Sequence, residues 1–448
     1  MHNFYIINPK TAAVAHRLMN NSTVKRLWKS FCLEDGEIEI KPCEEFIFKI
    51  GDPGIAELKT ESEYVLSVSE NGIFIKARDY SGLVHGFYAL LMKINYNNDR
   101  FEIHFTKEYG DFLIKNRMIH ICIFPEDSLY FIKKLIRFSA LCGYTHIVIE
   151  FWGMLKYDCL KELAWPQAFT KDEARALITE CRELGLEPIP MFNQLGHASA
   201  SRVCYGKHVV LDQNPRLQKY FTPDGWVWNI QSDETAELLK HVRAELYELF
   251  GTGEFIHLGF DEAYFISHNP FLRKKLPEYI AGLTATAENE GRRPMIWMDM
   301  LLEENSFKDC YTVGNSSETA KLQAAASPST VFIDWQYNCR TAPVPSLLSL
   351  KNCGHDCIGA PWLDKDNYTA HINTVAENKM FGLMLTTWHT LRENMPGILG
   401  CAEKCGAHTF EWGKEILTYE KTATLLRRVS FEGNTYESAG WSKSQIEI

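Results

Sequence analysis

The sequence predicts an α/β protein built on a (β/α)8 TIM barrel, preceded by a small α+β domain. The chain has 448 residues, more than one average domain, and this length suits a large barrel with an accessory domain. From about residue 112, strand-like apolar runs alternate with helical stretches, the pattern of parallel β/α units. Polar and aromatic residues directly follow many of these runs, where such barrels carry their functional groups.

Residues 1–108 have the elements of the small domain. The turn Glu70-Asn71-Gly72 between two apolar runs predicts a β-hairpin. Ser81-Gly82-Leu83 opens an apolar helix. The expected elements are the strand Phe4–Ile7, a helical stretch at Val14–Phe31, the hairpin strands Tyr64–Val68 and Ile73–Ala77, the helix Val84–Ile94 and the strand Phe101–Phe105.

The barrel is expected over residues 112–430, and residues 431–448 form a C-terminal tail. Helical stretches such as Leu129–Cys142, Lys171–Leu184 and Asp233–Phe250 separate most of the strands. The eight expected strands are Arg117–Ile123, Thr145–Phe151, Glu187–Phe192, Phe255–Phe260, Pro294–Met298, Thr330–Trp335, Cys357–Ala360 and Gly382–Thr387.

The composition argues against several classes of partner and site. A formal net charge of −10 disfavours nucleic acid and anionic membrane surfaces. The 13 cysteines are scattered, and the close pairs Cys353/Cys357 and Cys401/Cys405 suit one helix face better than a zinc site. The start of the chain lacks the basic and apolar regions of a signal peptide, and no apolar run reaches membrane-spanning length. We expect a cytoplasmic protein without a metal or an organic cofactor.

The most informative stretch is Phe255–Glu262, an apolar run that ends in the adjacent acids Asp261 and Glu262. Two neighbouring carboxyl groups repel each other when both are ionised, so such pairs occur where one holds a proton and the other a charge. The simpler interpretation is a solvated acid pair in a loop. Its position after the fourth barrel strand favours the catalytic interpretation.

Aromatic side chains follow several consecutive strands. Trp297, Trp335, Trp362 and Trp388 each lie at or just after a strand end. Any one of them alone is explained by packing in the core. Because they recur at the same position, they favour a pocket walled by indole rings, which suits the apolar faces of a sugar.

Three stretches, Pro188–His197, Ile256–Tyr264 and Pro294–Met300, resemble family 20 glycoside hydrolases, the β-N-acetylhexosaminidases. Within that family the sequence looks closest to the branch that contains hexosaminidase D and its bacterial relatives. Residues 1–108 also resemble the small domain that precedes the barrel in this family. The element His-x-Gly-x-Asp-Glu at residues 257–262 is fairly specific on the fourth barrel strand.

The resemblance implies substrate-assisted catalysis, in which the acetamido oxygen of the sugar attacks its own anomeric carbon. Glu262 matches the general acid/base. Asp261 matches the residue that holds the acetamido N–H and supports the positive charge of the oxazolinium. A charged Asp261 next door should also help Glu262 to keep its proton.

The resemblance assigns substrate contacts to further residues, each with a simpler alternative. Arg117 matches an arginine that forks onto sugar hydroxyls, or it makes a surface salt bridge. His197 matches a histidine that orients the general acid, or it bonds to the backbone. Asp299 binds substrate or braces its loop. The indoles that enclose the acetyl methyl and the ring correspond to Trp297, Trp335 and Trp388.

Three positions depart from the family pattern. Glu150 is the only acid near the expected partner of His197 on strand two. Tyr337 and Tyr368 are both candidates for the tyrosine that bonds the acetamido oxygen, and Tyr337 is favoured because it follows a strand end. The outer-hydroxyl acid has no direct counterpart after Trp388, and Arg392 and Glu393 are its candidates.

The expected function is therefore exo-acting, retaining hydrolysis of terminal β-linked N-acetylglucosamine or N-acetylgalactosamine from a small glycoside or glycan fragment. One alternative is a sugar-binding pseudo-enzyme of the same fold, and another is a glycosidase for a related amido-sugar linkage. The sequence leaves the sugar epimer, the linkage and the oligomeric state open.

Overall fold

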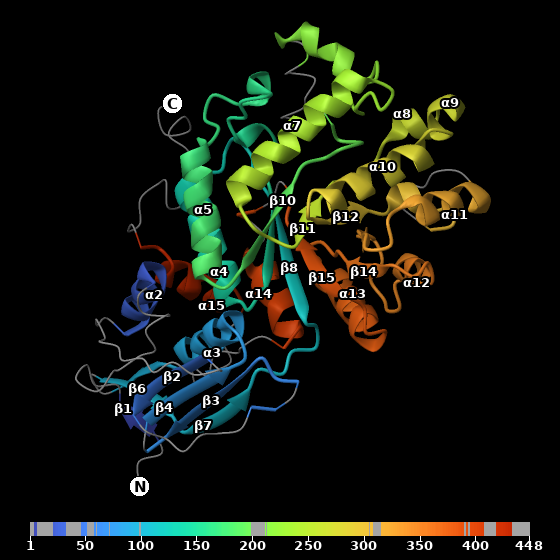
Figure 1. Ribbon diagram of the computed structural model, residues 1–448. Helices are drawn as coiled ribbons and strands as arrows, with labels where there is room; N and C mark the ends of the chain where they lie inside the picture. The colour runs from blue at the N-terminus through green and yellow to red at the C-terminus, as the bar shows by residue number, and fades with distance from the viewer. Residues whose placement is uncertain are drawn as a thin grey trace.

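The computed structural model describes residues 4–6, 21–32, 46–51, 58–59, 61–70, 72–97, 100–198, 211, 213–303, 305–307, 315–388, 391–392, 395–406 and 418–431. A closed barrel forms the centre of the molecule, and a small domain with two antiparallel sheets lies at one end of it (Figure 1).

All eight expected barrel strands are present, and they close in the order β10-β11-β12-β13-β14-β15-β8-β9. All pairs are parallel, and the first strand closes the ring by pairing with the last, from Asn116 beside Gly382 to His120 beside Thr386. The strands are β8 (Asn116–Cys122), β9 (His146–Glu150), β10 (Glu187–Met191), β11 (Phe255–His257), β12 (Arg293–Trp297), β13 (Val331–Asp334), β14 (Asp356–Gly359) and β15 (Gly382–Thr386).

The barrel interior is a packed apolar cluster. Strands buried on both faces read as nearly continuous apolar runs, which is why these segments stood out in the sequence. The cluster comprises Met118, Val148, Ile189, Met191, Phe255, Met295, Trp297, Val331, Ile333, Ile358, Ala360 and Met384.

The fourth strand is shorter than the sequence predicts. We expected it to run to Phe260, but β11 ends at His257. Gly259 and Phe260 have φ angles of +69° and +95°, outside the range of a strand. The last part of the apolar run is therefore a bent loop that carries the two acids.

Helices surround the barrel (Figure 1). Several begin at side-chain caps: α5 and α11 have complete capping boxes, Thr170 with Glu173 and Asn315 with Glu318. None of the described helices is long and apolar enough to cross a membrane. They are α4 (Leu129–Leu141), α5 (Lys171–Glu183), α7 (Asp233–Phe250), α8 (Tyr264–Ser267), α9 (Pro270–Arg273), α10 (Leu276–Asn289), α11 (Ser316–Ala325), α12 (Pro345–Lys351), α13 (Lys365–Glu377), α14 (Met395–Lys404) and α15 (Thr418–Arg428).

The small domain contains a three-stranded sheet, β1-β6-β5, and a four-stranded sheet, β2-β4-β3-β7. The predicted hairpin is confirmed, since β3 and β4 pair antiparallel. Helix α3 begins four residues earlier than expected because the side chain of Asp79 caps it. The elements are β1 (Phe4–Ile6), α2 (Ser22–Cys32), β2 (Phe46–Gly51), β3 (Tyr64–Ser69), β4 (Gly72–Ala77), α3 (Tyr80–Met92), β5 (Asn95–Asn97), β6 (Arg100–His104) and β7 (Thr106–Tyr109).

Two sequence predictions lie partly outside the described residues. The expected helical stretch began at position 14, and the structure describes it from Ser22 onward as α2. Of the predicted tail, only residue 431 is described.

An ion pair joins the small domain to the amino end of the barrel. The Arg117 guanidinium, buried at the start of β8, donates from Nη1 to Glu63 Oε1 at 2.8 Å and from Nη2 to Glu63 Oε2 at 3.1 Å. It also bonds the carbonyl oxygens of Gly143 and Ile114, and it lies 3.6 Å from the centre of the Phe112 ring. His85 contacts the same carboxylate at 2.7 Å.

We expect Glu63→Gln to destabilise the fold in a pH-dependent way. Burial disfavours the charged form of Glu63, but His85 and Arg117 outweigh it and lower the pKa of Glu63 to about 2. Because the pKa is lowered in the folded state, the charged group adds stability at pH values above the ordinary carboxyl pKa. This stability is lost as the pH falls toward 2. The variant should therefore lose about 2 kcal/mol at neutral pH and progressively less below pH 4.

Thermal unfolding at pH 7 and pH 3 measures this difference. Glu61→Gln is the control, because Glu61 is a nearby exposed acid. An equal loss of stability for Glu63→Gln at both pH values would contradict the electrostatic account.

Candidate active site

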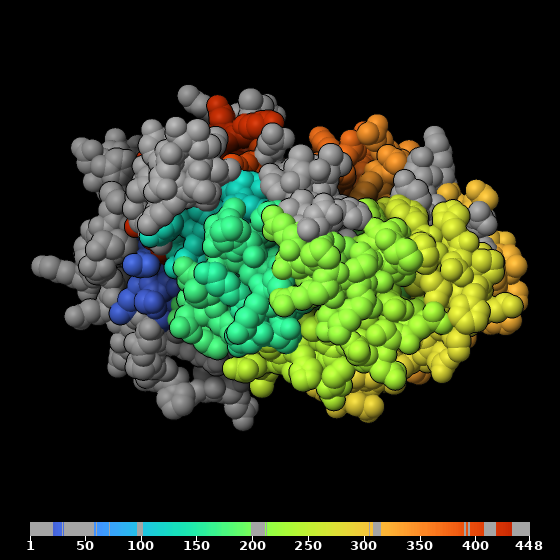
Figure 2. Space-filling model, turned by 90° about the horizontal axis from the view of Figure 1, so that it is seen from above, coloured from blue at the N-terminus to red at the C-terminus, as the bar shows by residue number. Residues whose placement is uncertain are grey.

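The two acids lie on the loop after β11, at the carboxyl end of the barrel and opposite to the small domain. Asp261 is 6% exposed, whereas the Glu262 side chain is 20% exposed and can reach a ligand. Figure 2 shows this face from above, where the segments after β9 and β10, in green, lie next to the yellow segments after β11.

The backbone is strained at this end of the barrel. His197, Phe260, Glu262 and Trp388 all have positive φ, at +46°, +95°, +48° and +42°. Each such residue costs about 1–3 kcal/mol, and strain of this kind clusters at functional sites. The positive φ angles of Phe260 and Glu262 give the Glu262 side chain a different direction from the one it would have in a regular strand.

His197 contacts both acids. Its Nε2 lies 2.7 Å from Glu262 Oε2 and 3.4 Å from Asp261 Oδ2. The expected strand-two partner, Glu150, instead lies 3.3 Å from His120 Nε2 and accepts from Asn193 Nδ2 at 3.2 Å. The imidazole of His197 therefore bridges the acid pair.

Asp299 braces the catalytic loop, the second of the two roles that its position suggested. It is fully buried, and its two oxygens accept from the Glu262 backbone N–H at 2.8 Å and from Trp335 Nε1 at 3.0 Å. Burial and the charge of Asp261 raise the pKa of Asp299 well above its usual value. The prediction of direct substrate contact is corrected, because a side chain with no exposed surface cannot meet a sugar.

The environment of Asp261 favours its protonated form at mildly acidic pH. Burial raises its pKa to about 6, the neighbouring His197 opposes the rise, and the charges of Glu262 and Glu150 add to it. Asp261 Oδ1 is buried and has no hydrogen-bond partner within the described structure. Buried acceptors normally have a donor, so this oxygen is suited to an N–H or O–H group of a ligand.

The aromatic residues form a wall and a floor. Trp388 lines the pocket and donates from Nε1 to the Tyr337 hydroxyl at 2.8 Å. The Trp335 ring lies 5.4 Å from the Tyr337 ring. Trp297 is fully buried in the barrel core, with its ring 5.9 Å from that of Trp388, so it supports the wall from below, and the prediction that it contacts the sugar is corrected.

Of the two candidate tyrosines, Tyr337 lies at the site. Tyr368 is on α13, where its hydroxyl packs close to Gly400 of α14. Arg392 bonds the carbonyl oxygen of Glu126 and lies over the Phe131 ring. Glu393 lies outside the described residues.

The prediction for Arg117 is wrong. Arg117 is the second residue of β8, and at about 3.3 Å per residue it lies about 17 Å from Cys122 at the other end of the strand. Its guanidinium binds Glu63 at the amino end of the barrel. On the pocket side, the corresponding wall consists of Cys122, Ile123, Phe124 and Pro125.

Three residues that line this site were not among the predicted substrate-binding residues, although Glu150 was named as a candidate partner of His197. Glu150, Trp152 and Asn193 line the pocket together with His197, Asp261 and Trp388. Glu150 lies near the end of predicted strand two, and Trp152 and Asn193 directly follow predicted strands two and three, so their position at strand ends was an available signal.

Trp226 was also missed. Its indole donates to the Glu262 carbonyl oxygen at 2.7 Å, and its ring lies 4.7 Å from that of His197. Because Trp226 follows a long connection and not a strand, nothing in the strand pattern marked it.

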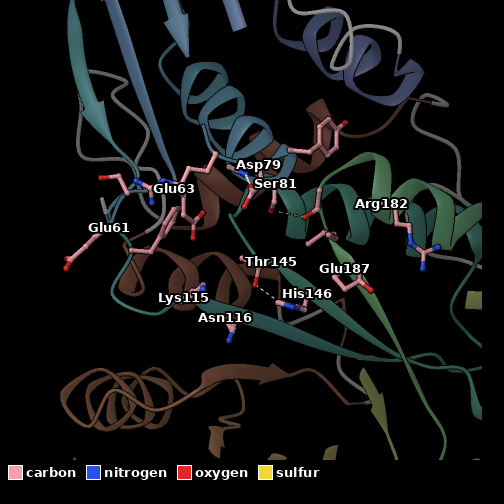
Figure 3. A pocket seen from close by; sticks show the side chains of 17 residues that line it. Glu61, Glu63, Asp79, Ser81, Lys115, Asn116, Thr145, His146, Arg182 and Glu187 are labelled. Carbon is pink, nitrogen blue, oxygen red and sulfur yellow. Dashed lines mark hydrogen bonds between the residues drawn. The ribbon is translucent and has the colours of Figure 1, made fainter. Parts of the chain in front are cut away.

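A larger cavity, of about 730 Å³, lies at the opposite end of the barrel (Figure 3). It is lined by the amino ends of β8, β9 and β10 and by the start of α3. Ser81 and Thr145 already bond groups of the protein there, to the Gly185 carbonyl oxygen and the His146 ring. We place the active site at the smaller pocket because it is lined by Asp261, by Trp388 and by His197, the histidine that contacts Glu262.

Comparison with known proteins finds a matching family model and similar solved structures. The catalytic-domain model of glycosyl hydrolase family 20 matches residues 153–340. The structure of a family 20 exo-β-N-acetylglucosaminidase from Vibrio harveyi, in complex with N-acetylglucosamine, has a TM-score of 0.67 at 15% identity, over 97% of this chain and 76% of that chain.

Two further structures have the same fold. A mutant Streptomyces plicatus β-hexosaminidase in complex with its product has a TM-score of 0.67 at 14% identity, over 99% of this chain and 93% of that chain. The β-N-acetylhexosaminidase of Bacteroides fragilis has a TM-score of 0.59 at 17% identity, over 86% and 83% of the two chains.

The barrel, the acid pair at its carboxyl end and the match to the family model define a glycoside hydrolase. The part of the chain that matches the catalytic domain of this family, residues 153–340, contains both acids, His197 and Asp299.

We expect Gly196→Ala to disrupt the site, because the loops after β10 and β11 touch at Gly196. A Cβ there would lie 1.8 Å from the Asp261 carbonyl oxygen and 3.0 Å from the Ala263 nitrogen, both backbone atoms. Moving the acid-bearing loop should cost about 1–3 kcal/mol of stability and lower the rate of glycoside hydrolysis.

Gly282→Ala is the matched control. Gly282 lies within α10, and its Cβ would meet no atom within 4 Å. This change should leave activity intact and add about 0.5–1 kcal/mol of stability. Thermal unfolding and a rate assay are measured for both variants. Normal activity of Gly196→Ala would contradict the close packing of Gly196 against the Asp261 carbonyl oxygen.

Proposed function

We propose that this protein is an exo-acting β-N-acetylhexosaminidase that removes terminal β-linked N-acetylglucosamine or N-acetylgalactosamine with retention of configuration. The observation that carries the proposal is that Asp261 Oδ1 is buried without a hydrogen-bond partner. It lies beside the Glu262 carboxylate, which His197 contacts. The similarity to structures named as hexosaminidases supports it.

Asp261 holds and supports the acetamide in this proposal. Its Oδ1 accepts the acetamido N–H, which turns the acetamido oxygen toward the anomeric carbon. That oxygen forms a bond to the anomeric carbon as the bond to the leaving oxygen breaks. The ionised carboxylate then lies next to the positive oxazolinium, where a preorganised charge is most effective.

Glu262 moves the proton. It protonates the leaving oxygen in the first step and takes a proton from water in the second, as the water oxygen attacks the anomeric carbon and opens the oxazoline ring. His197 Nε2 lies 2.7 Å from its carboxylate and fixes its orientation. Two displacements at one carbon give retention.

The aromatic wall encloses the sugar. We propose that Trp335 and Trp388 contact the acetyl methyl and the ring, and that the Tyr337 hydroxyl, next to Trp388 Nε1, bonds the acetamido oxygen. The pseudo-enzyme alternative is less favoured, because both acids and the bridging histidine are arranged for proton transfer.

We further propose that the enzyme works in a reducing compartment such as the cytoplasm. Its support is that nine cysteines of the described residues are free thiols, most of them buried among apolar side chains.

Asp261→Asn is the direct test of the mechanism. Removing the charge next to the oxazolinium should lower kcat by about 10²-fold or more for an aryl N-acetyl-β-glucosaminide. The wild-type enzyme should be nearly inert on aryl glycosides with an amine or a hydroxyl at carbon 2, because these lack the attacking oxygen. Rapid cleavage of the carbon 2 hydroxyl substrate would reject the proposed function.

The pH dependence offers a second test. The pKa of Asp261 is raised to about 6, so the charged form exists mainly above that pH. We therefore expect kcat/KM to fall about tenfold per pH unit as pH drops below about 6. The charge of Glu150 contributes to the raised pKa, so Glu150→Gln should shift this fall to lower pH. A profile that is flat from pH 7 to pH 4 would contradict the role of a charged Asp261.

A further inference from the structure

The pocket holds a third acid to which the proposed mechanism gives no contact with the substrate. Glu150 is the last residue of β9, is 5% exposed, and lines the pocket with Asp261 and Trp388. Carboxylates are rarely buried to this degree without a strong reason, because removing their hydration is costly. A pocket that binds a polyhydroxylated ligand provides one.

Two fixed donors hold the Glu150 carboxylate in place. His120 Nε2 lies 3.3 Å from Oε2, and Asn193 Nδ2 donates to Oε1 at 3.2 Å. Because a carboxylate only accepts hydrogen bonds, these contacts orient it and stabilise its charged form. His120 is itself held between the Trp297 and Trp388 rings, at 6.0 and 4.7 Å.

The wall next to Glu150 cannot bind hydroxyl groups through its side chains. Ile123, Phe124 and Pro125 are apolar, and Cys122 is at most a weak donor. Arg117, which was expected to bind sugar hydroxyls from this strand, lies at the other end of the barrel. Among the polar groups on this side of the described pocket, Glu150, its donor Asn193 and the indole of Trp152 can meet hydroxyl groups, and Glu150 is the only one of the three that carries a charge.

The position of Glu150 in the same pocket as Asp261 indicates which hydroxyl is concerned. Glu262 and Asp261 follow β11, Asn193 follows β10, and Glu150 ends β9, the next strand around the barrel. In the proposed function, Glu262 serves the oxygen on carbon 1 and Asp261 the acetamide on carbon 2. Glu150 and Asp261 line the same pocket, and the ring neighbour of carbon 2 that Glu262 does not serve is carbon 3.

We propose that Glu150 is a specificity-determining residue that accepts a hydrogen bond from the 3-hydroxyl of the N-acetylhexosamine. This inference rests on the proposed function, since it takes the ring orientation from the roles of Asp261 and Glu262. It makes the enzyme selective for sugars with a free 3-hydroxyl, because a substituent or an anionic group there would meet a buried carboxylate.

The test uses the full-length enzyme, an aryl N-acetyl-β-glucosaminide and its 3-deoxy analogue. The wild type should cleave the 3-deoxy analogue with kcat/KM reduced about 10- to 100-fold, the range for losing a hydrogen bond to a charged group. Loss of an electron-withdrawing hydroxyl alone would speed glycoside cleavage, so slower turnover reports the lost contact. The 6-deoxy analogue should be affected much less.

Glu150→Gln completes a thermodynamic cycle in which one change is made in the enzyme and the other, loss of the 3-hydroxyl, is made in the substrate. It should lower kcat/KM for the parent substrate about 10- to 100-fold and have little further effect on the 3-deoxy analogue. Glu187→Gln, the same change at the amino end of β10, is the control and should affect both substrates equally little.

The outcomes separate the inference from the proposed function. If the wild type cleaves both substrates at similar rates, or if Glu150→Gln slows both by the same factor, Glu150 does not read the 3-hydroxyl, while the hexosaminidase activity stands. If the wild type cleaves neither, the proposed function fails first. Should Glu150→Gln not fold, the wild-type ratio for the 3-deoxy and 6-deoxy analogues still decides the question.

Discussion

The carboxylate of Asp299 is the contact that holds the site together. It accepts one hydrogen bond from the Glu262 backbone and one from the Trp335 indole, so it ties the ends of β11, β12 and β13 to one another. It does so without any exposure to solvent, next to a second buried acid. The two donors meet different oxygens of the Asp299 carboxyl group, so a side chain with two acceptor oxygens suits this position in spite of its burial.

The strained residues follow from the same arrangement. Glu262 has to leave the strand direction to face the pocket, and Phe260 and Gly259 make that turn with positive φ. Gly196 allows the neighbouring loop to approach within contact distance, and the Trp226 indole binds the Glu262 carbonyl oxygen from the other side. The geometry of one side chain is thus fixed by groups from several strand ends, so the strain is kept by the surrounding structure.

The barrel was predictable because its strands are buried on both faces and separated by helices of ordinary length. The acid pair was predictable because it directly follows a strand. Arg117 was misplaced although the sequence carried the correcting signal: the predicted strand began at this residue, which puts it at the amino end. The hydrogen bonds of Glu150 and the contact of Trp226 with Glu262 depend on side-chain directions and on a long connection, and neither leaves a periodic pattern.

The separation of the two barrel ends has a consequence for how such a protein can diversify. Glu63 and Arg117 fasten the small domain at the amino end, while the acids, the indoles and Glu150 lie at the carboxyl end. Substitutions that alter substrate preference therefore need not weaken the Glu63–Arg117 ion pair that attaches the small domain. Substitutions at that ion pair need not alter selectivity. A designed chimera could therefore combine the amino-end contacts of a stable homologue with the carboxyl-end loops of a homologue that prefers another sugar.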